Sequence, residues 1–442
     1  MNKAQKAFHK SRRAQLMKKL GKNSVALILS NSMRNKSYDA SYKFKQNNNF
    51  YYLTGFDEPN AILVLAPGGM KIKTKDGNSK TVREILFVQK RNPFMEKWDG
   101  KRLGSAAVKT DLGIEMGMDN SAFDELMKSK IGKFNTIFIN IAELYDTAGE
   151  FREIVTPLIN ALRVVTSWTQ VCDINNIIGV MRSVKLPYEI GLMQKAADIT
   201  AIGLNNVLKQ LKPGMYEYQV QAILESAYMD NGSSEIAFDT IVASGHNAST
   251  LHYITNREKI KNGSLVLIDT GAQHEHYCAD ITRTFPADGR FTKEQRIIYD
   301  IVLKGNEAGI KMSKAGKKYS SLDKHVKKVM AEELVKHKVI KDADNIKNFC
   351  YHGIGHDLGL DTHDAVPFSS IGNLDYDTFK VGNVTTIEPG LYFPPGTEGF
   401  DKKYTGIGIR IEDDVLITAG GNKVLTGGIA KDADEIEKIM NS

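Results

Sequence analysis

Four acidic residues in the second half of the chain stand inside apolar segments that have the character of strands. They are Asp269, Asp280, Glu388 and Glu412. A buried carboxylate is costly unless it is paired or bound to a metal ion, so four of them in such segments point to a shared cationic partner. The pattern predicts a site for two metal ions.

The two aspartates flank a predicted β-hairpin. Apolar runs at 265–270 and 279–284 enclose a polar turn near His274, and Asp269 and Asp280 are equidistant from that turn. Equidistant residues of a tight hairpin face each other with Cβ atoms about 5 Å apart, where two like charges repel. We therefore expect a cation between them. The alternatives are a longer turn that shifts the register, or one aspartate that points to solvent.

The two glutamates occupy a second pair of strand-like runs. Glu388 lies in VTTIEPGLY and Glu412 in GIGIRIEDDVLIT, around a loop rich in glycine, proline and charge. Two hairpins with two acids each suggest one shared site. A softer ligand is expected from HGIGHDLGLDTHD, which contains His352, His356 and His363. The glycines between the first two histidines argue against a regular helix, so we expect a shaped loop that aims each histidine individually.

These segments, in this order, resemble the Xaa-Pro aminopeptidases (aminopeptidases P) of the pita-bread metallopeptidase group. Relatives in that group include prolidases, methionine aminopeptidases and creatinases. Further matching stretches are FYYLTGFDEPNAILVL, KWDGKRLG, IVASGHNASTLHY, LVLIDTG and ADITRTFP. The resemblance extends from about residue 10 to the C-terminus and therefore covers nearly the whole chain.

The resemblance implies a role for each metal ligand. Asp269 would be a bidentate ligand of one ion, Asp280 and Glu412 would bridge both ions, and His356 and Glu388 would complete the other. Two divalent ions would lower the pKa of a shared water and polarise the carbonyl of a scissile amide. We expect Mn²⁺, which suits an oxygen-rich donor set, although affinity alone would favour Zn²⁺ or Co²⁺.

Further catalytic roles are also implied by the resemblance. Glu388 would shuttle a proton, and His252 and His363 would lie near the reacting carbonyl and the leaving nitrogen. An isolated histidine near an apolar run is more often a structural residue, which is the alternative for each. The chain departs from many bacterial relatives at Phe238, where they carry a tyrosine. A hydroxyl contact at that point is either missing or replaced by Asp239.

The resemblance implies five substrate-binding residues: His352, Tyr392, Arg410, Asp39 and Trp98. Asp39 and Trp98, in the first half of the chain, are hypotheses for binding the free amine and the proline region of the substrate. Local packing of the indole of Trp98 is the alternative.

Two domains are expected, because 442 residues exceed the size at which a single core keeps growing. Residues 24–170 alternate apolar strand runs with helical stretches around 121–130 and 149–162, which is an α/β pattern. We therefore predict an α/β N-terminal domain at 1–178 and a catalytic domain at 179–442.

The catalytic domain is expected to open with a long amphipathic helix that ends at Pro213 and Gly214. Long helices at 294–314 and 320–338 accompany the two acid-bearing hairpins, and this repetition suggests an internal pseudo-twofold. The resemblance implies that the domain has the α+β pita-bread fold.

Composition excludes several classes of protein. No run of about 18 apolar residues is present, so no membrane span is expected. The net charge of +7 is spread over many lysines without a basic stripe interleaved with aromatic residues, so no nucleic-acid partner is expected. Three scattered cysteines are too few for a disulfide framework and favour a reducing compartment, the cytoplasm.

Three functions remain after this comparison. The first is a Xaa-Pro aminopeptidase that releases the N-terminal residue from peptides with proline in second position and that forms a homo-oligomer, a dimer or a tetramer. The second is a prolidase restricted to Xaa-Pro dipeptides. The third is a non-catalytic peptide-binding relative, which the presence of all five ligand residues disfavours.

Overall fold

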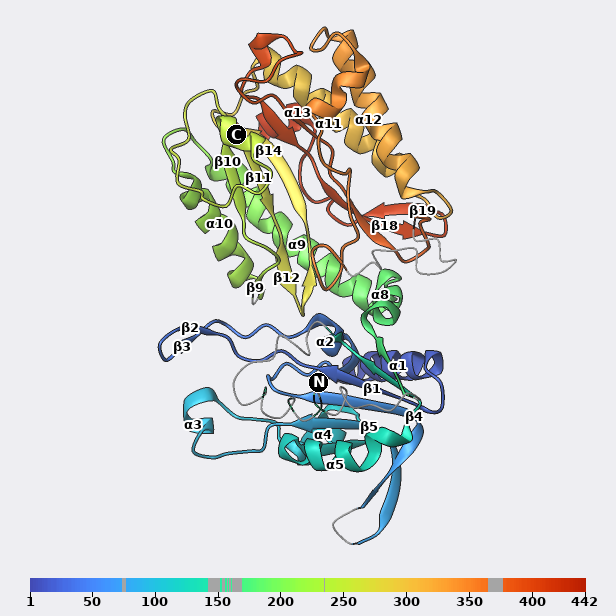
Figure 1. The fold of residues 1–442 in the computed structure, drawn as a ribbon. Coiled ribbons are helices and arrows are strands. Elements are labelled where there is room, and N and C mark those ends of the chain that lie inside the picture. Colours follow the sequence, from blue (N-terminus) through green and yellow to red (C-terminus); the bar gives the residue numbers. More distant parts are fainter. Residues whose placement is uncertain are drawn as a thin grey trace. The chain divides into compact units, whose positions relative to one another are not determined.

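The computed structural model describes residues 1–73, 77–141, 169–233, 235–364 and 377–442, together with the single residues 152, 156, 158 and 160. The chain divides into two compact units, Met1–Gly179 and Val180–Ser442 (Figure 1). The helical stretch predicted at 149–162 lies largely outside the described residues.

A mixed six-stranded sheet with the strand order β6-β5-β4-β1-β7-β8 organises the first unit. Strand β1 is antiparallel to β4 and parallel to β7, and it is buried throughout. The sheet strands are β1 Ser24–Leu29, β4 Ile62–Lys73, β5 Ser79–Val88, β6 Met116–Asp119, β7 Thr136–Ile139 and β8 Gln170–Asp173; a separate hairpin consists of β2 Asn35–Ser37 and β3 Ala40–Ser41. The apolar runs of this part of the sequence therefore form strands, and the predicted α/β character is confirmed.

The helices of the first unit are short except for the first one. They are α1 Lys3–Lys19, α2 Asn48–Thr54, α3 Glu96–Asp99, α4 Val108–Leu112 and α5 Phe123–Lys130. Phe123 and Met127, one helical turn apart on α5, pack into the core beneath the sheet. Helix α8 Asn175–Ser183 contains the boundary between the two units.

The second unit opens with the predicted long helix. Helix α9 Pro187–Gln210 has proline at its first turn, where no amide hydrogen bond is lost, and Pro213 and Gly214 follow its end. The other helices are α10 Glu217–Asp230, α11 Lys293–Met312, α12 Tyr319–Lys336 and α13 Ala433–Met440. None of the helices in the described part of the chain combines the length and apolar character needed to span a membrane.

The strands of the second unit are short and antiparallel. They are β9 Glu235–Ile236, β10 Ile241–Ser244, β11 Leu265–Thr270, β12 Ala272–His274, β13 Tyr277–Cys278, β14 Ile281–Pro286, β15 Val384–Ile387, β16 Gly390–Tyr392, β17 Gly408–Arg410, β18 Asp413–Thr418 and β19 Gly421–Val424. Two three-stranded antiparallel sheets, β10-β11-β14 and β15-β18-β19, come one from each sequence half of the unit.

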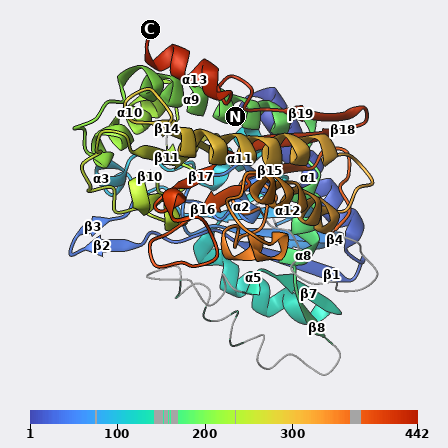
Figure 2. The same cartoon turned by 90° about the horizontal axis from the view of Figure 1, so that it is seen from above.

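Each of these sheets has its own pair of helices. Helices α9 and α10 pack together, with α9 against β12 to β14 and α10 against β10. Helices α11 and α12 pack together, and α11 contacts β15, β16 and β17 (Figures 1 and 2). The α+β arrangement with an internal pseudo-twofold, which the sequence predicts, is confirmed.

The turn of the first hairpin differs from its prediction. Glu275 and His276, with φ angles of 48° and 68°, form the two-residue loop between β12 and β13, a turn that requires positive φ at both positions. The same register continues through β11 and β14 and pairs Asp269 with Thr282. The predicted direct pairing of Asp269 with Asp280 is therefore wrong by two residues. Because side chains alternate with a period of two, the aspartates still share a face, as diagonal neighbours.

Candidate metal centre

Three of the four acids lie where their hairpins are interrupted. Asp280 precedes β14, Glu388 separates β15 from β16, and Glu412 separates β17 from β18. The ladders on both sides of the second interruption share one register, which places Glu388 opposite Glu412. In the first hairpin a Cβ added to Gly271 would lie 1.8 Å from the carbonyl oxygen of Ala279, so only glycine permits this close approach of the two strands.

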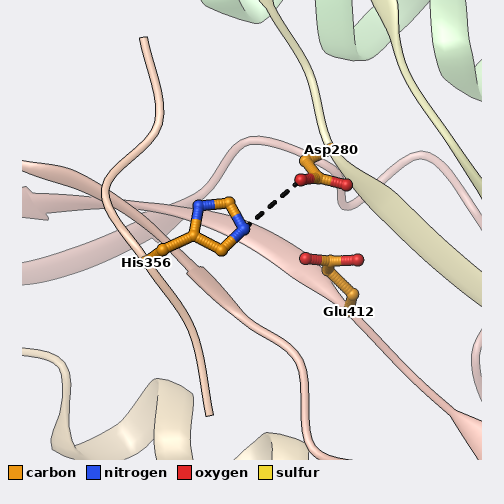
Figure 3. Close-up of side chains that lie close together, drawn as sticks. All are labelled: Asp280, His356 and Glu412. Atoms are coloured by element: carbon orange, nitrogen blue, oxygen red, sulfur yellow. Dashed lines mark ion pairs between the residues drawn. The ribbon is translucent and has the colours of Figure 1, made fainter. Parts of the chain in front are cut away.

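Side chains from three separate segments converge on one point. Asp280, His356 and Glu412 each offer a ligand atom within 4.8 Å of the others (Figure 3). The Nε2 atom of His356 lies 3.5 Å from Oδ2 of Asp280 and 3.7 Å from Oε1 of Glu388. The three-residue cluster and Glu388 therefore belong to one site.

The segment that carries His356 is a loop fixed by backbone hydrogen bonds, as predicted. The His356 amide donates to Oγ1 of Thr386 at 3.0 Å, and the Thr386 amide donates to the carbonyl of His356 at 2.9 Å. A Cβ on Gly355 would lie 2.0 Å from the Thr386 carbonyl oxygen. Nδ1 of the imidazole lies 3.1 Å from the carbonyl oxygen of Asp357, which leaves Nε2 to face the acids.

Electrostatics in the cluster disfavour ionised carboxylates. Burial, followed by Glu412 among the neighbouring acids, raises the pKa of Asp280 well above its usual range, and burial and Glu388 do the same for Glu412. Burial raises the pKa of Glu388 to about 8, although Arg410 opposes this shift. Burial lowers the pKa of His356 to about 4, so its imidazole is neutral near pH 7. A cation at the cluster would reverse these penalties for the acids and would bind the neutral imidazole.

Arg410 connects Asp269 to the rest of the site. Its Nη2 lies 2.5 Å from Oδ2 of Asp269, its Nη1 donates to the Tyr392 hydroxyl at 2.9 Å, and its Nε donates to Oγ1 of Thr282 at 3.0 Å. Thr282 in turn donates to Oε2 of Glu412 at 2.7 Å. A single guanidinium therefore orients acids from both hairpins.

The residues present fit divalent cations. Oδ1 of Asp269 is buried, and no hydrogen-bond donor in the described part of the chain reaches it. With all four carboxylates ionised, the guanidinium of Arg410 would leave a formal charge of about minus three, which needs cationic compensation in a buried setting. Carboxylate oxygens with a single imidazole form a donor set suited to divalent first-row metals.

A cavity of about 840 Å³ contains the site. Its lining includes all the residues predicted as metal ligands, together with His252, His352, His363 and Arg410. Phe238, Ile241, Leu251 and Ile254 form an apolar part of the wall. Tyr392 is fully buried behind this lining, and its hydroxyl lies 2.9 Å from Nε2 of His352.

Two of the predicted histidines, His352 and His363, lie against the residues of the cluster. The centroid of the His363 ring lies 4.0 Å from that of the His356 ring, with the two ring planes tilted by 30°. Burial, followed by the nearby His252, lowers the pKa of His363. Nδ1 of His352 lies 3.8 Å from Oε2 of Glu388, and burial, followed by Arg410, lowers the pKa of His352 to about 4. His352 and His363 are thus neutral near pH 7.

Two predicted substrate-binding residues belong to the first unit. Trp98, on α3, has 76% of its surface exposed, and Asp39 is exposed in the turn between β2 and β3. Their contacts with substrate stay a prediction.

Sequence reasoning missed an ion cluster around the buried Asp364, at the end of the loop 352–364 that carries His356 and His363. Nη2 of Arg182 lies 2.5 Å from both Oδ2 of Asp361 and Oδ1 of Asp364, and Nζ of Lys185 lies 2.8 Å from Oδ2 of Asp364. Burial alone would raise the pKa of Asp364, but Arg182 and Lys185 hold it well below its usual range. Asp364 directly follows His363, so this cluster anchors the end of the loop. The sequence did contain one indication of this cluster, the acid Asp364 next to His363.

The chain matches known families in both halves. Residues 191–419 match metallopeptidase family M24, and residues 9–138 match the aminopeptidase P N-terminal domain. The Xaa-Pro aminopeptidase of Escherichia coli (strain K12) is 35% identical over 447 residues, covering 97% of this chain and 96% of that protein.

Solved structures are similar over the same length. Zinc-substituted E. coli aminopeptidase P in complex with product has a TM-score of 0.89 at 33% identity, covering 99% of this chain and 98% of that chain. Proline aminopeptidase P II from Yersinia pestis has a TM-score of 0.87 at 32% identity, covering 99% of both chains.

Proposed function

The chain belongs to metallopeptidase family M24, with the pita-bread fold of a metallo-aminopeptidase, and from this premise we propose that it is a Xaa-Pro aminopeptidase. It would release the N-terminal residue from peptides with proline in second position. The observation that carries the proposal is the convergence of Asp280, His356 and Glu412 within 4.8 Å, in a cavity that Asp269 and Glu388 also line.

We assign these five residues to two divalent ions. As the family resemblance implies, Asp280 and Glu412 would be shared by both ions; both belong to the group of three side chains whose ligand atoms lie within 4.8 Å of one another. Asp269 would complete one position, and His356 and Glu388 the other. Bound divalent ions supply Lewis acidity toward the scissile carbonyl and lower the pKa of a water.

Glu388 is the residue best placed to transfer a proton. One of its oxygens lies 3.7 Å from His356 and the other 3.8 Å from His352, so the carboxylate faces both the cluster and the cavity. We propose that it accepts a proton from the attacking water and passes it to the departing nitrogen of proline. The imidazoles of His252 and His363 would donate hydrogen bonds to the developing charge on the carbonyl oxygen and to the leaving group.

The substrate would lie along the cavity wall beside the acids, where His352 and Arg410 are found. Hydrogen bonds of 2.9 Å from Arg410 to Tyr392 and between Tyr392 and His352 hold the His352 ring at the cavity surface. We propose that His352, Tyr392 and Arg410 shape the substrate pocket in this way, and that Asp39 and Trp98 contact the substrate from the N-terminal domain. The domain bounds of 1–178 and 179–442, the manganese ions, the homo-oligomer and the cytoplasmic location stay predictions.

Peptide length and metal dependence test the proposal together. Metal-stripped protein is assayed with Arg-Pro-Pro and with the dipeptide Ala-Pro, before and after addition of Mn²⁺. Release of arginine from the tripeptide only after metal addition supports the aminopeptidase. Hydrolysis of the dipeptide alone would identify a prolidase instead, and no hydrolysis of either peptide would favour a peptide-binding relative.

A further inference from the structure

Glu217, in the first turn of α10, has a fully buried carboxylate that forms no ion pair within the described part of the chain. Its Oε1 accepts hydrogen bonds from the Ser244 amide at 2.8 Å, the Ser244 hydroxyl at 2.7 Å and Nδ2 of Asn247 at 3.1 Å. Its Oε2 accepts from the Tyr253 hydroxyl and the Glu258 amide, both at 2.9 Å. Five donors and the positive end of the helix dipole therefore stabilise the charge.

All five donors belong to one segment, residues 244–258, and that segment carries His252. Leu251, His252 and Ile254 line the cavity that contains the metal cluster. Tyr253 stands between them and contacts Glu217 instead. The carboxylate therefore holds the chain directly beside the proposed catalytic histidine.

The imidazole of His252 depends on this backbone for its position. Its ring forms no hydrogen bond within the residues that the structure describes, and the residue is exposed and lines the cavity. Burial, followed by the hydrogen bond to Glu217, raises the pKa of Tyr253 to about 12, so the Tyr253 hydroxyl keeps its proton at neutral pH. The anchor next to His252 is thus a permanent donor to Glu217.

Other hydrogen bonds hold the segment on either side of His252. The Tyr351 hydroxyl donates to the carbonyl of Ser249 at 2.8 Å, and Oδ1 of Asn256 accepts from the Val242 amide at 3.0 Å. Both bonds are made to residues within the segment, one before and one after the histidine. Among the described contacts, the bond from Tyr253 to Glu217 is the one adjacent to the histidine.

We propose that Glu217 is a positioning residue for the reaction: it holds residues 244–258 so that the His252 imidazole faces the metal cluster. The inference rests on the proposed function, because it places Glu217 in the reaction through His252.

Glu189 provides a matched control. It lies in the first turn of α9 and is 1% exposed, and it accepts hydrogen bonds of 2.9 Å from the Tyr277 hydroxyl and the Leu186 amide. Neither of these partners lines the cavity. Glu189→Gln therefore perturbs a similar buried carboxylate without moving His252.

The test is a double-mutant cycle at saturating Mn²⁺, with Arg-Pro-Pro as substrate and bound metal measured for every variant. Glu217→Gln leaves the Glu258 amide facing an amide nitrogen. We therefore expect kcat to fall roughly tenfold, which is less than the loss of about 10²-fold or more expected for His252→Ala. Metal content and KM should change less than about twofold, and Glu189→Gln should leave kcat within about twofold. In the His252→Ala background, Glu217→Gln should cost no further activity. Hydrogen exchange should speed up in peptides that cover residues 244–258.

An equal loss from Glu217→Gln in both backgrounds, or a matching loss from Glu189→Gln, would overturn the inference and leave the proposed function intact. A wild-type protein that hydrolyses no Xaa-Pro peptide would overturn both. If Glu217→Gln does not fold, Tyr253→Phe removes one donor and keeps the other four. It should lower kcat by about threefold and show the same dependence on His252; a loss that persists without His252 would contradict the proposal.

Discussion

Metal-stripped protein should become less stable as the pH rises, which is the opposite of the behaviour expected for carboxylates whose pKa is lowered by an ion pair. Burial raises the pKa of Glu388 from 4.5 to about 8 in the folded protein, whereas the unfolded chain keeps the ordinary value. Between these two values the folded state holds a proton that the unfolded state has released. The stability from this group is therefore complete below the unfolded pKa and is lost as the pH rises through the folded pKa.

The size of the effect follows from the pKa difference. Between the unfolded and folded pKa of Glu388, each pH unit lowers the free energy of unfolding by about 1.4 kcal/mol. The rise from about pH 5.5 to pH 7.5 therefore lowers it by about 2.7 kcal/mol. For a structural unit of the size of Val180–Ser442, that loss corresponds to a fall in Tm of roughly 5 to 10 °C. Asp280 and Glu412, whose pKa values are also raised by burial, act in the same direction.

Calorimetry of metal-stripped protein at a series of pH values measures this slope. Glu388→Gln, which cannot ionise, should remove the share of the slope that belongs to Glu388. Mn²⁺ favours the ionised carboxylates, so the Tm difference between loaded and stripped protein should widen as the pH rises. A Tm of the stripped wild type that stays level or rises from about pH 5.5 to pH 7.5, with the same profile in Glu388→Gln, would refute this reasoning.

Three further outcomes are expected. Asp280→Ala and Glu412→Ala should each abolish metal retention and peptide hydrolysis together, as measured by elemental analysis and turnover. The control Asp288→Ala, at an exposed position nearby in the sequence, should affect neither. Full activity in either cluster variant would contradict the bridging assignment. Asp364→Asn should destabilise the protein by about 3 kcal/mol in urea unfolding, because it strands buried cations, and the deficit should shrink below about pH 4; an unchanged midpoint would contradict this. Trp98→Ala should lower turnover of Arg-Pro-Pro without changing Tm, and equal turnover would reject a substrate contact.

Much of the fold could be predicted because apolar spacing and helix-ending residues are local signals. The run at 265–270 became β11 with the same bounds, and Pro213 and Gly214 follow the end of α9. The acids could be found for the same reason, since a charged residue in an apolar strand conflicts with its surroundings. The structure places all four of them in the lining of one cavity.

What the sequence did not reveal depends on partners distant along the chain or on unusual backbone angles. The turn at Glu275 and His276 contains no glycine or asparagine to mark its positive φ angles, so the predicted pairing slipped by two residues. Glu217 looks like any acid in the first turn of a helix, and its donors are 27 to 41 residues away. Arg182 meets Asp364 across 182 residues, a distance that no local pattern spans.

The division of the donor set between two hairpins has a consequence for synthesis of the chain. Asp269 and Asp280 emerge from the ribosome well before His356, and Glu412 emerges last of the five. Neither hairpin alone contains all five proposed ligands. Thr282 and Glu412 come into contact only when both halves of the second unit have folded. A nascent chain therefore exposes acidic side chains but no assembled hydrolytic centre, so peptide cleavage is withheld until the two halves have docked.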